Sequence, residues 1–273
     1  MSPPKIHAPD LKEKKSRGEK IAMLTAYDAT MARLLDQAGV DAILVGDSVG
    51  MVVLGYENTL AVTLDDMLHH TRAVMRGASR ALVVTDMPFL SYQVSVEEAV
   101  RNAGRLLQEG GASAVKLEGG RPVLDAVRRI VDVGIPVMGH LGLQPQSVNQ
   151  VGGYLKQATR PQDADALVAD ALALQDAGAF AIVLESIPEE VAKTTTAALD
   201  IPTIGIGAGP YCDGQVLVSH DMLGLFDRFV PSFVKQYATM AETVRAATRA
   251  YVDDVHEGRY PLSLSKISGV PNR

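Results

Sequence analysis

The sequence predicts an α/β fold, a single (β/α)8 barrel, and three observations support that class. Strand-like and helix-like segments alternate from residue 21 onward, as they do in proteins with a parallel sheet. The 273 residues are enough for one barrel, which commonly takes about 250 residues. Four short apolar runs each follow a glycine and end on a carboxylate, and these are Gly39–Asp47, Gly77–Asp86, Gly111–Glu118 and Gly178–Glu185.

Each of these four runs predicts the end of a helix followed by a buried strand. The glycine is expected to end the helix in the left-handed conformation, and the apolar residues are typical of a strand buried on both faces. The predicted eighth strand is either residues 215–219 or residues 229–234, and Pro231 disfavours the second choice. The other predicted strands are residues 21–27, 42–47, 81–86, 114–118, 136–140, 180–185 and 202–206.

Helical periodicity fills the intervals between these strands. Thr63 and Ser95 are suitable N-caps, and Pro188 suits a first helical position. Residues 238–255 are predicted to form an amphipathic last helix, with Met240, Val244, Ala247, Tyr251 and Val255 on one stripe. The other predicted helices are residues 30–38, 64–76, 96–108, 123–133, 164–177 and 189–198.

The composition is that of an ordinary soluble globular protein. Hydrophobic residues make up 47% of the chain, and 32 acidic against 26 basic residues give a net charge of −6. A nucleic-acid or anionic-membrane partner is therefore disfavoured. The one basic stretch, Lys12–Lys20, is expected to belong to a solvated first helix.

The domain organisation predicted from the sequence is one barrel domain over residues 1–273, with a short polar N-terminal segment and the C-terminal amphipathic helix. That N-terminal segment lacks the apolar core of a signal peptide, and no run approaches the roughly 18 apolar residues of a membrane span. We therefore expect a cytoplasmic protein. A single cysteine, Cys212, excludes an internal disulfide framework, and no local signature marks it as a nucleophile.

The carboxylates at the strand ends are the first candidate functional residues. Parallel strands would bring them to the carboxyl-end face of the barrel, where such barrels place their active sites. Asp47 and Asp86 end neighbouring strands, and Mg²⁺ needs only one or two carboxylates when water or substrate supplies its other ligands. The competing interpretation, that these acids only cap loops, is weaker for four acids at matched positions than for one.

Two basic residues, Lys116 and His140, accompany the acids as candidates. Lys116 stands two residues before Glu118 and therefore shares its face of the strand, although a purely structural ion pair would also satisfy a buried lysine. His140 ends the fifth predicted strand on the same face of the barrel. Gly205–Gly209 (GIGAG) closes the seventh strand, and a glycine-rich turn there is better suited to close substrate approach than to nucleotide binding.

Six ordered motifs resemble the ketopantoate hydroxymethyltransferase family. The resemblance spans about residues 19–258 and implies a barrel of the phosphoenolpyruvate/pyruvate superfamily, Mg²⁺, 5,10-methylenetetrahydrofolate as one-carbon donor, and a homo-oligomer, a decamer. The implied acceptor is the α-keto acid 3-methyl-2-oxobutanoate. The motifs are Thr25–Asp28 (TAYD), Val45–Ser48 (VGDS), Asp86–Phe89 (DMPF), Lys116–Gly120 (KLEGG), Gly139–Gln146 (GHLGLQPQ) and Gly205–Gly209.

The resemblance also implies roles for individual residues. Glu185 matches the family's proton acceptor. The positions that match metal ligands are Asp47, Asp86 and Glu118, and those that match keto-acid contacts are Asp47, Ser48, Asp86 and Lys116. His140 is predicted to lie near the new hydroxyl group as a further substrate contact. Two segments depart from the family pattern, residues 152–160 and the tail from Tyr260 to Lys266.

These assignments predict a metal-assisted reaction in which the keto acid loses its C3 proton and the resulting enolate attacks the folate-borne one-carbon unit. Two alternatives remain at this stage. One is another metal-dependent keto-acid enzyme of the same barrel class, a carbon–carbon lyase or a phosphonopyruvate-type mutase, although such lyases usually carry a catalytic cysteine in a Lys-Lys-Cys-Gly-like loop that is missing here. The other is a barrel that only binds a small acid, or a structural oligomer.

Overall fold

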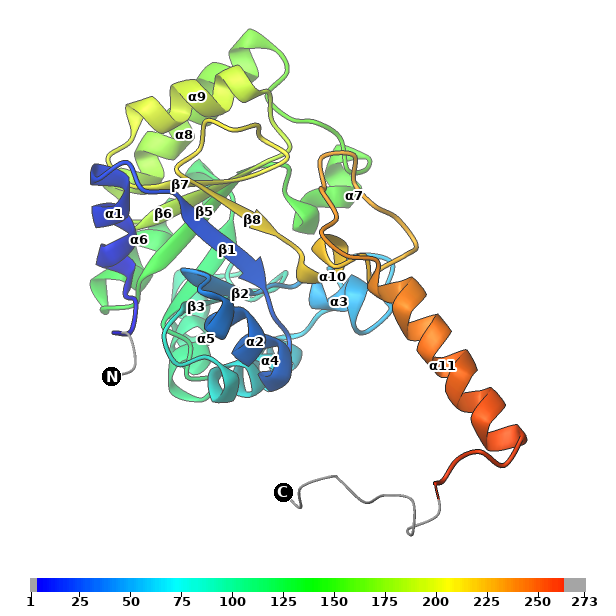
Figure 1. Ribbon diagram of the computed structural model, residues 1–273. Coiled ribbons are helices and arrows are strands. Elements are labelled where there is room, and N and C mark those ends of the chain that lie inside the picture. Colours follow the sequence, from blue (N-terminus) through cyan, green and yellow to red (C-terminus); the bar gives the residue numbers. More distant parts are fainter. Residues whose placement is uncertain (1–3, 263–273) are drawn as a thin grey trace. The chain divides into compact units, whose positions relative to one another are not determined.

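The computed structural model describes residues 4–262, and its centre is a closed barrel of eight parallel strands in sequential order (Figure 1). Each strand pairs with the next one along the chain, and β8 pairs with β1. The predicted barrel is therefore confirmed. The strands are β1 (Ile21–Thr25), β2 (Ala42–Val45), β3 (Leu82–Asp86), β4 (Ala114–Glu118), β5 (Val137–Gly142), β6 (Ala181–Glu185), β7 (Thr203–Ile206) and β8 (Gly214–Leu217).

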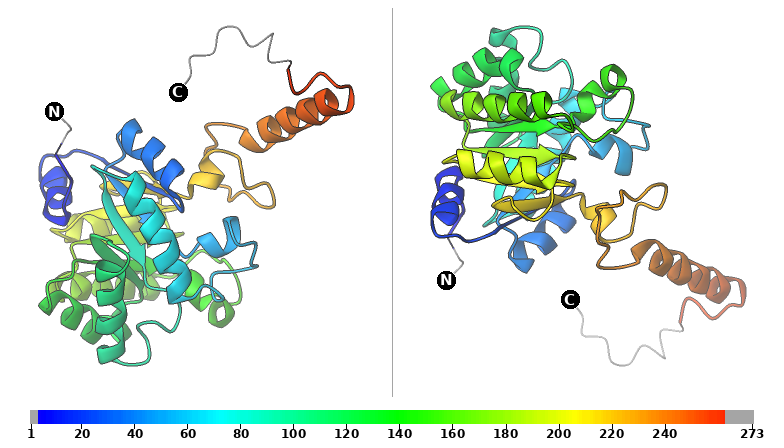
Figure 2. Two further views of the ribbon diagram at one scale, coloured as in Figure 1. Left: turned by 90° about the horizontal axis from the view of Figure 1, so that it is seen from below. Right: turned by 90° about the horizontal axis from the view of Figure 1, so that it is seen from above.

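Helices cover the outside of the barrel, and α8 and α9 lie side by side there (Figure 2). The predicted helices are confirmed to within three residues at their ends. The helices are α1 (Ala8–Ser16), α2 (Ala29–Ala38), α3 (Val49–Val52), α4 (Leu64–Gly77), α5 (Val96–Gln108), α6 (Leu124–Asp132), α7 (Val148–Val151), α8 (Pro161–Asp176), α9 (Glu189–Ala198), α10 (Ser219–Met222) and α11 (Met240–His256), with 3-10 turns at Arg121–Val123 and Pro145–Ser147.

The eighth strand follows the first of the two predicted alternatives. β8 covers Gly214–Leu217, whereas residues 229–234 contain no strand. Residues 207–213, which join β7 to β8, contain no helix, so the alternation of strand and helix is broken at this one step. The connection is short because its glycines turn the chain sharply, with Gly207 at φ 62° and Gly209 at φ 78°.

The prediction of left-handed glycines is correct at three of the four runs. Gly39, Gly111 and Gly178 have φ of 94°, 81° and 97°. Gly77 is instead the last residue of α4 and is not left-handed. A Cβ there would lie 2.2 Å from the carbonyl oxygen of Ala29, so glycine is required at this position by the close approach of two backbones.

The N-terminal end of the barrel is closed by the segment that precedes β1. Ile6 and Leu11 are buried and pack with the first residues of the strands, among them Ile21, Ala42 and Leu82. The basic stretch Lys12–Lys20 is exposed or half-buried, as predicted, whereas Leu11, which precedes it on α1, has no exposed surface. The lysines of α1 lie at the rim, where Lys14 Nζ is 3.0 Å from Asp41 Oδ1.

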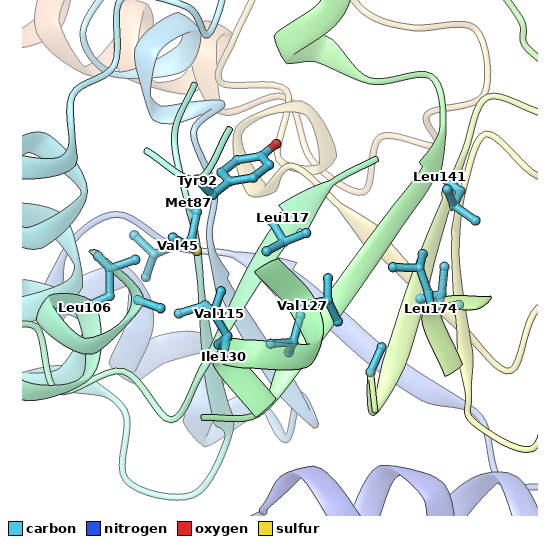
Figure 3. Packing of buried hydrophobic residues seen from close by; sticks show 14 of the residues in the cluster. Val45, Met87, Tyr92, Leu106, Val115, Leu117, Val127, Ile130, Leu141 and Leu174 are labelled. Atoms are coloured by element: carbon cyan, nitrogen blue, oxygen red, sulfur yellow. The ribbon is translucent and has the colours of Figure 1, made fainter. Parts of the chain in front are cut away.

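A second apolar layer fills the space between the strands and the surrounding helices. Figure 3 shows Leu106 of α5 and Ile130 of α6 packed toward Val115 of β4. Each of these three side chains has no exposed surface. This packing fixes the positions of the strand ends, on which the candidate functional residues lie.

The chain divides into two compact units, one ending at Ser219 and the other beginning at His220. The first contains all eight strands, and the second contains α11. The predicted apolar stripe of α11 is exposed, and no residue of this helix is buried in the described chain. No helix within residues 4–262 is long and apolar enough to cross a membrane. The single-domain assignment stays a prediction, and residues 263–266 of the divergent tail lie outside the described residues.

Candidate active site at the carboxyl end of the barrel

The predicted acids and their neighbours Lys116 and His140 gather at the carboxyl ends of β2 to β6. Asp86 pairs in register with Lys116, and Glu118 pairs with His140. Asp47 stands two residues beyond the end of β2, because that strand ends at Val45 and is shorter than predicted. All five side chains are at most 5% exposed, so their charges interact with little screening by water.

Asp86 is held by its neighbours on two sides. Lys116 Nζ lies 2.7 Å from Asp86 Oδ1, in an ion pair whose angles are poor for a hydrogen bond. The other oxygen, Oδ2, accepts a hydrogen bond from the backbone N–H of Asp47 at 3.1 Å. The β3 and β2 ends are therefore tied together through one carboxylate.

The buried cluster contains more acids than bases, since Lys116 faces Asp47, Asp86 and Glu118. Burial raises the pKa of Asp47 to about 7, and the neighbouring Asp86 carboxylate adds to this, while Lys116 opposes it. Burial and the Asp47 carboxylate raise the pKa of Glu118 well above its usual value. Burial alone would lower the pKa of Lys116, but the three carboxylates raise it. The lysine therefore stays charged, and the acids lack a full set of countercharges.

His140 lies between Lys116 and Glu185. Its Nδ1 is 3.4 Å from Lys116 Nζ, and its Nε2 is 3.2 Å from Glu185 Oε2, although this second contact is poorly aligned for a hydrogen bond. An ammonium group can only donate, so Nδ1 accepts and a neutral ring carries its proton on Nε2, facing Glu185. Burial and Lys116 lower the pKa of His140, which favours that neutral ring.

Glu185 is the most accessible of these acids. It ends β6 opposite Gly142 of β5, and its side chain is 17% exposed. It is therefore set apart from the three more deeply buried carboxylates, while still within contact of His140.

Three residues that the sequence analysis did not assign complete this end of the barrel. Gln146 donates through Nε2 to Asp47 Oδ2 at 2.9 Å, and its Oε1 accepts from the hydroxyl of Tyr92 at 2.8 Å. Tyr27 shares a hydrogen bond with Ser48 at 2.9 Å between their hydroxyl oxygens. Gln146 and Tyr27 stand inside the motifs GHLGLQPQ and TAYD, which was the available signal, whereas Tyr92 follows the DMPF motif by three residues.

The divergent segment 152–160 reaches this site through Tyr154. Its hydroxyl lies 3.6 Å from the sulfur of Met51 on α3. Partial burial and the carboxylates of Asp47, Glu185 and Glu118 raise the pKa of Tyr154, so its hydroxyl lies within electrostatic range of the acidic cluster. The loops after β2 and β5 are thus in contact beside the candidate site.

Cys212 lies apart from these residues, in the β7–β8 connection. Its thiol is buried, and burial raises its pKa. A buried thiol with a raised pKa is a poor nucleophile, in agreement with the prediction made from the sequence.

Among residues 4–262, no group of three or more His, Cys, Asp or Glu side chains is arranged as a ready-made metal cluster. The donor set nevertheless fits a hard divalent cation that takes part of its ligands from water or substrate. Asp86 Oδ1 is buried beside Lys116 Nζ at 2.7 Å, and the surrounding acids outnumber this lysine. The site therefore has oxygen donors and an excess of acidic groups, which a cation would stabilise in their charged form.

Solved structures with the same fold have other activities. A 2,3-dimethylmalate lyase of the PEP mutase/isocitrate lyase superfamily aligns with a TM-score of 0.61 at 19% identity, covering 98% of this chain and 93% of the other. A phosphonopyruvate hydrolase solved with oxalate and Mg²⁺ aligns with a TM-score of 0.61 at 12% identity, covering 93% and 88%. At sequence identities this low, the structural similarity supports only the fold, which is the barrel type predicted from the sequence.

Sequence comparison is more specific. The 3-methyl-2-oxobutanoate hydroxymethyltransferase of Moorella thermoacetica is 60% identical over 257 residues, covering 94% of this chain and 96% of that protein. The protein of the same name from Syntrophus aciditrophicus is 58% identical, covering 94% of both. The sequence profile of the family described as ketopantoate hydroxymethyltransferase matches residues 5–263. The chain therefore belongs to the ketopantoate hydroxymethyltransferase family, whose enzymes transfer a hydroxymethyl group in the pantothenate pathway.

Proposed function

We propose that the chain transfers a hydroxymethyl group from 5,10-methylenetetrahydrofolate to 3-methyl-2-oxobutanoate, giving 2-dehydropantoate, with Mg²⁺ bound at the carboxyl end of the barrel. The observation that carries this proposal is the buried cluster of Asp47, Asp86 and Glu118 around one lysine, in a chain of this family. A decameric homo-oligomer and a cytoplasmic location stay predictions.

Asp47 and Asp86 would hold the metal ion, and Glu118 would contribute directly or through water. Bound Mg²⁺ supplies Lewis-acid chemistry, which stabilises negative charge that develops on a substrate oxygen. The unbalanced carboxylates support this assignment, because a divalent cation would restore the charge that Lys116 leaves uncompensated.

Lys116 and Ser48 would bind the keto acid. The ammonium of Lys116 is buried and stays charged, so it can stabilise an enolate oxygen in a site of low dielectric constant. Ser48 lies directly after Asp47, and its hydroxyl is oriented by Tyr27. This hydroxyl would donate to the substrate carboxylate.

Glu185 would accept the C3 proton of the keto acid. A general base must be near the substrate but outside the metal set, and Glu185 is the accessible acid that meets both conditions. His140 faces Glu185 through Nε2 at 3.2 Å, so it can orient the carboxylate and contact the new hydroxyl group.

The proposal is tested by following deuterium exchange at C3 of 3-methyl-2-oxobutanoate by proton NMR, with enzyme and Mg²⁺ but no folate. We expect exchange that depends on the enzyme and stops when EDTA removes the metal. Subsequent addition of 5,10-methylenetetrahydrofolate should give 2-dehydropantoate. Product formation without metal dependence would contradict the metal assignment, and absence of product would contradict the proposed reaction.

A further inference from the structure

Gln146 occupies the centre of a buried polar network between the strand ends. It is 6% exposed, and its amide makes four hydrogen bonds. Nε2 lies 2.9 Å from both Asp47 Oδ2 and the carbonyl oxygen of Met87. Oε1 accepts from Tyr92 at 2.8 Å and from Gln93 Nε2 at 3.2 Å.

This network determines which way the amide faces. The carbonyl oxygen of Met87 can only accept a hydrogen bond, so the atom beside it must be the NH₂ group of Gln146. The same NH₂ group therefore donates to Asp47. Both of its hydrogens and both acceptor positions of Oε1 are used, which leaves the side chain in one orientation.

The backbone of the same residue reaches a second carboxylate. The N–H of Gln146 donates to Glu118 Oε2 at 3.1 Å. Tyr92 adds a further connection, because its hydroxyl accepts from the N–H of Glu118 at 3.1 Å. One residue in the loop after β5 thus contacts acids at the ends of β2 and β4.

We propose that Gln146 is a positioning residue of the metal site, which holds Asp47 through Oδ2 and Glu118 through Oε2 and so fixes the orientation of two carboxylates that would bind the cation. The inference rests on the metal-dependent function proposed above. A carboxylate that already accepts an N–H bond on one oxygen keeps its rotamer when the cation binds, so less reorganisation accompanies binding. Tyr92 acts one step further out, by fixing the orientation of the Gln146 amide.

A purely structural role for Gln146 predicts a different behaviour. In that case the side chain would only fasten the loop after β5 to the barrel, and its loss would lower the melting temperature without changing the affinity for Mg²⁺. Metal affinity therefore separates the two roles.

The experiment compares Gln146→Leu, Tyr92→Phe and the wild-type protein by calorimetric titration with Mg²⁺, beside melting curves recorded without metal. Gln146→Leu keeps most of the side-chain volume and removes the amide, and we expect Mg²⁺ affinity to fall about 10- to 100-fold. Tyr92→Phe should cause a smaller loss. Gln150→Leu is the matched control, because Gln150 is an exposed glutamine on α7 and its replacement should leave affinity unchanged.

The outcomes distinguish this inference from the proposed function. If the Gln146→Leu protein folds and binds Mg²⁺ as tightly as the wild-type protein does, the positioning role is overturned. The metal assignment still stands in that case, because the wild-type protein binds Mg²⁺. If Gln146→Leu does not fold, Tyr92→Phe decides, and an unchanged affinity there overturns the inference. If the wild-type protein binds no Mg²⁺ with or without 3-methyl-2-oxobutanoate, the metal-dependent function itself is wrong.

Discussion

Two aspartates flank the four-residue strand β2 and lie in opposite electrostatic environments. Asp41 precedes the strand, at the end of the barrel covered by α1. Its Oδ1 lies 3.0 Å from Lys14 and 3.6 Å from Arg80. Its Oδ2 accepts a hydrogen bond from the N–H of Ala22 at 2.9 Å. Asp47 follows the strand among other acids, and burial raises its pKa to about 7. Both are buried, at 5% and 4% exposure, so burial alone does not mark a functional acid.

The comparison shows that the structural acid and the functional acid differ in how far neighbouring groups of the protein compensate their charge. At the α1 end, each buried charge has partners that belong to the protein. At the carboxyl end, Lys116 faces three acids, and the protein tolerates an arrangement that costs stability until a ligand binds. The predictions below test whether the two ends differ in this way, starting with the largest expected effect.

Asp47→Asn should lower turnover by about 10⁴, which corresponds to a loss of about 5 kcal/mol of charge stabilisation in the transition state. Its melting temperature without metal should stay the same or rise, because a buried, poorly compensated carboxylate is removed. Steady-state kinetics and differential scanning calorimetry measure the two effects. A strongly destabilised variant would show that Asp47 resembles Asp41.

Glu185→Gln should reduce turnover by about 10² to 10⁴, the range for loss of a positioned general base. The amide keeps the size of the side chain, so affinities for Mg²⁺ and the keto acid should change little. Rapid-quench turnover and calorimetry provide the measurements. Near-normal turnover would move the base role to His140, and lost Mg²⁺ binding would make Glu185 a metal ligand.

Leu11→Ala should destabilise the protein by about 2 to 5 kcal/mol, because it opens a cavity where α1 closes the barrel. The turnover of the folded enzyme should be unchanged, since the substitution lies at the opposite end from the acids. Urea unfolding followed by circular dichroism gives the free energy. Leu34→Ala is a control on an exposed leucine. Equal losses in both variants would argue against the closing role of α1.

Asp41→Asn should cost about 1 to 3 kcal/mol of stability, the range for hydrogen bonds to a charged group, and should leave turnover and Mg²⁺ affinity unchanged. This is the reverse of the pattern expected for Asp47→Asn. Thermal melting of both variants in one buffer makes the comparison direct. A loss of turnover in Asp41→Asn, with the fold intact, would remove the proposed distinction between the two ends.

Local sequence patterns were sufficient to predict the barrel and the positions of its carboxyl-end acids. A glycine, an apolar run and a carboxylate are neighbours in the chain, and parallel strands necessarily bring the residues after each run to one face. For this reason Asp47, Asp86, Glu118 and Glu185 could be placed at that face from sequence. Their functional roles stay predictions.

The remaining features depend on contacts between residues far apart in the chain, and only the tertiary structure decided them. Gln146 reaches Asp47 across 99 positions of sequence, and the burial of Leu11 depends on strands as distant in the chain as β8, which begins at Gly214. The choice of residues 214–217 as β8 is fixed by pairing with β1 on one side and β7 on the other. Periodicity reports which faces of a segment are apolar, but packing and hydrogen bonding determine which partners those faces and polar groups meet.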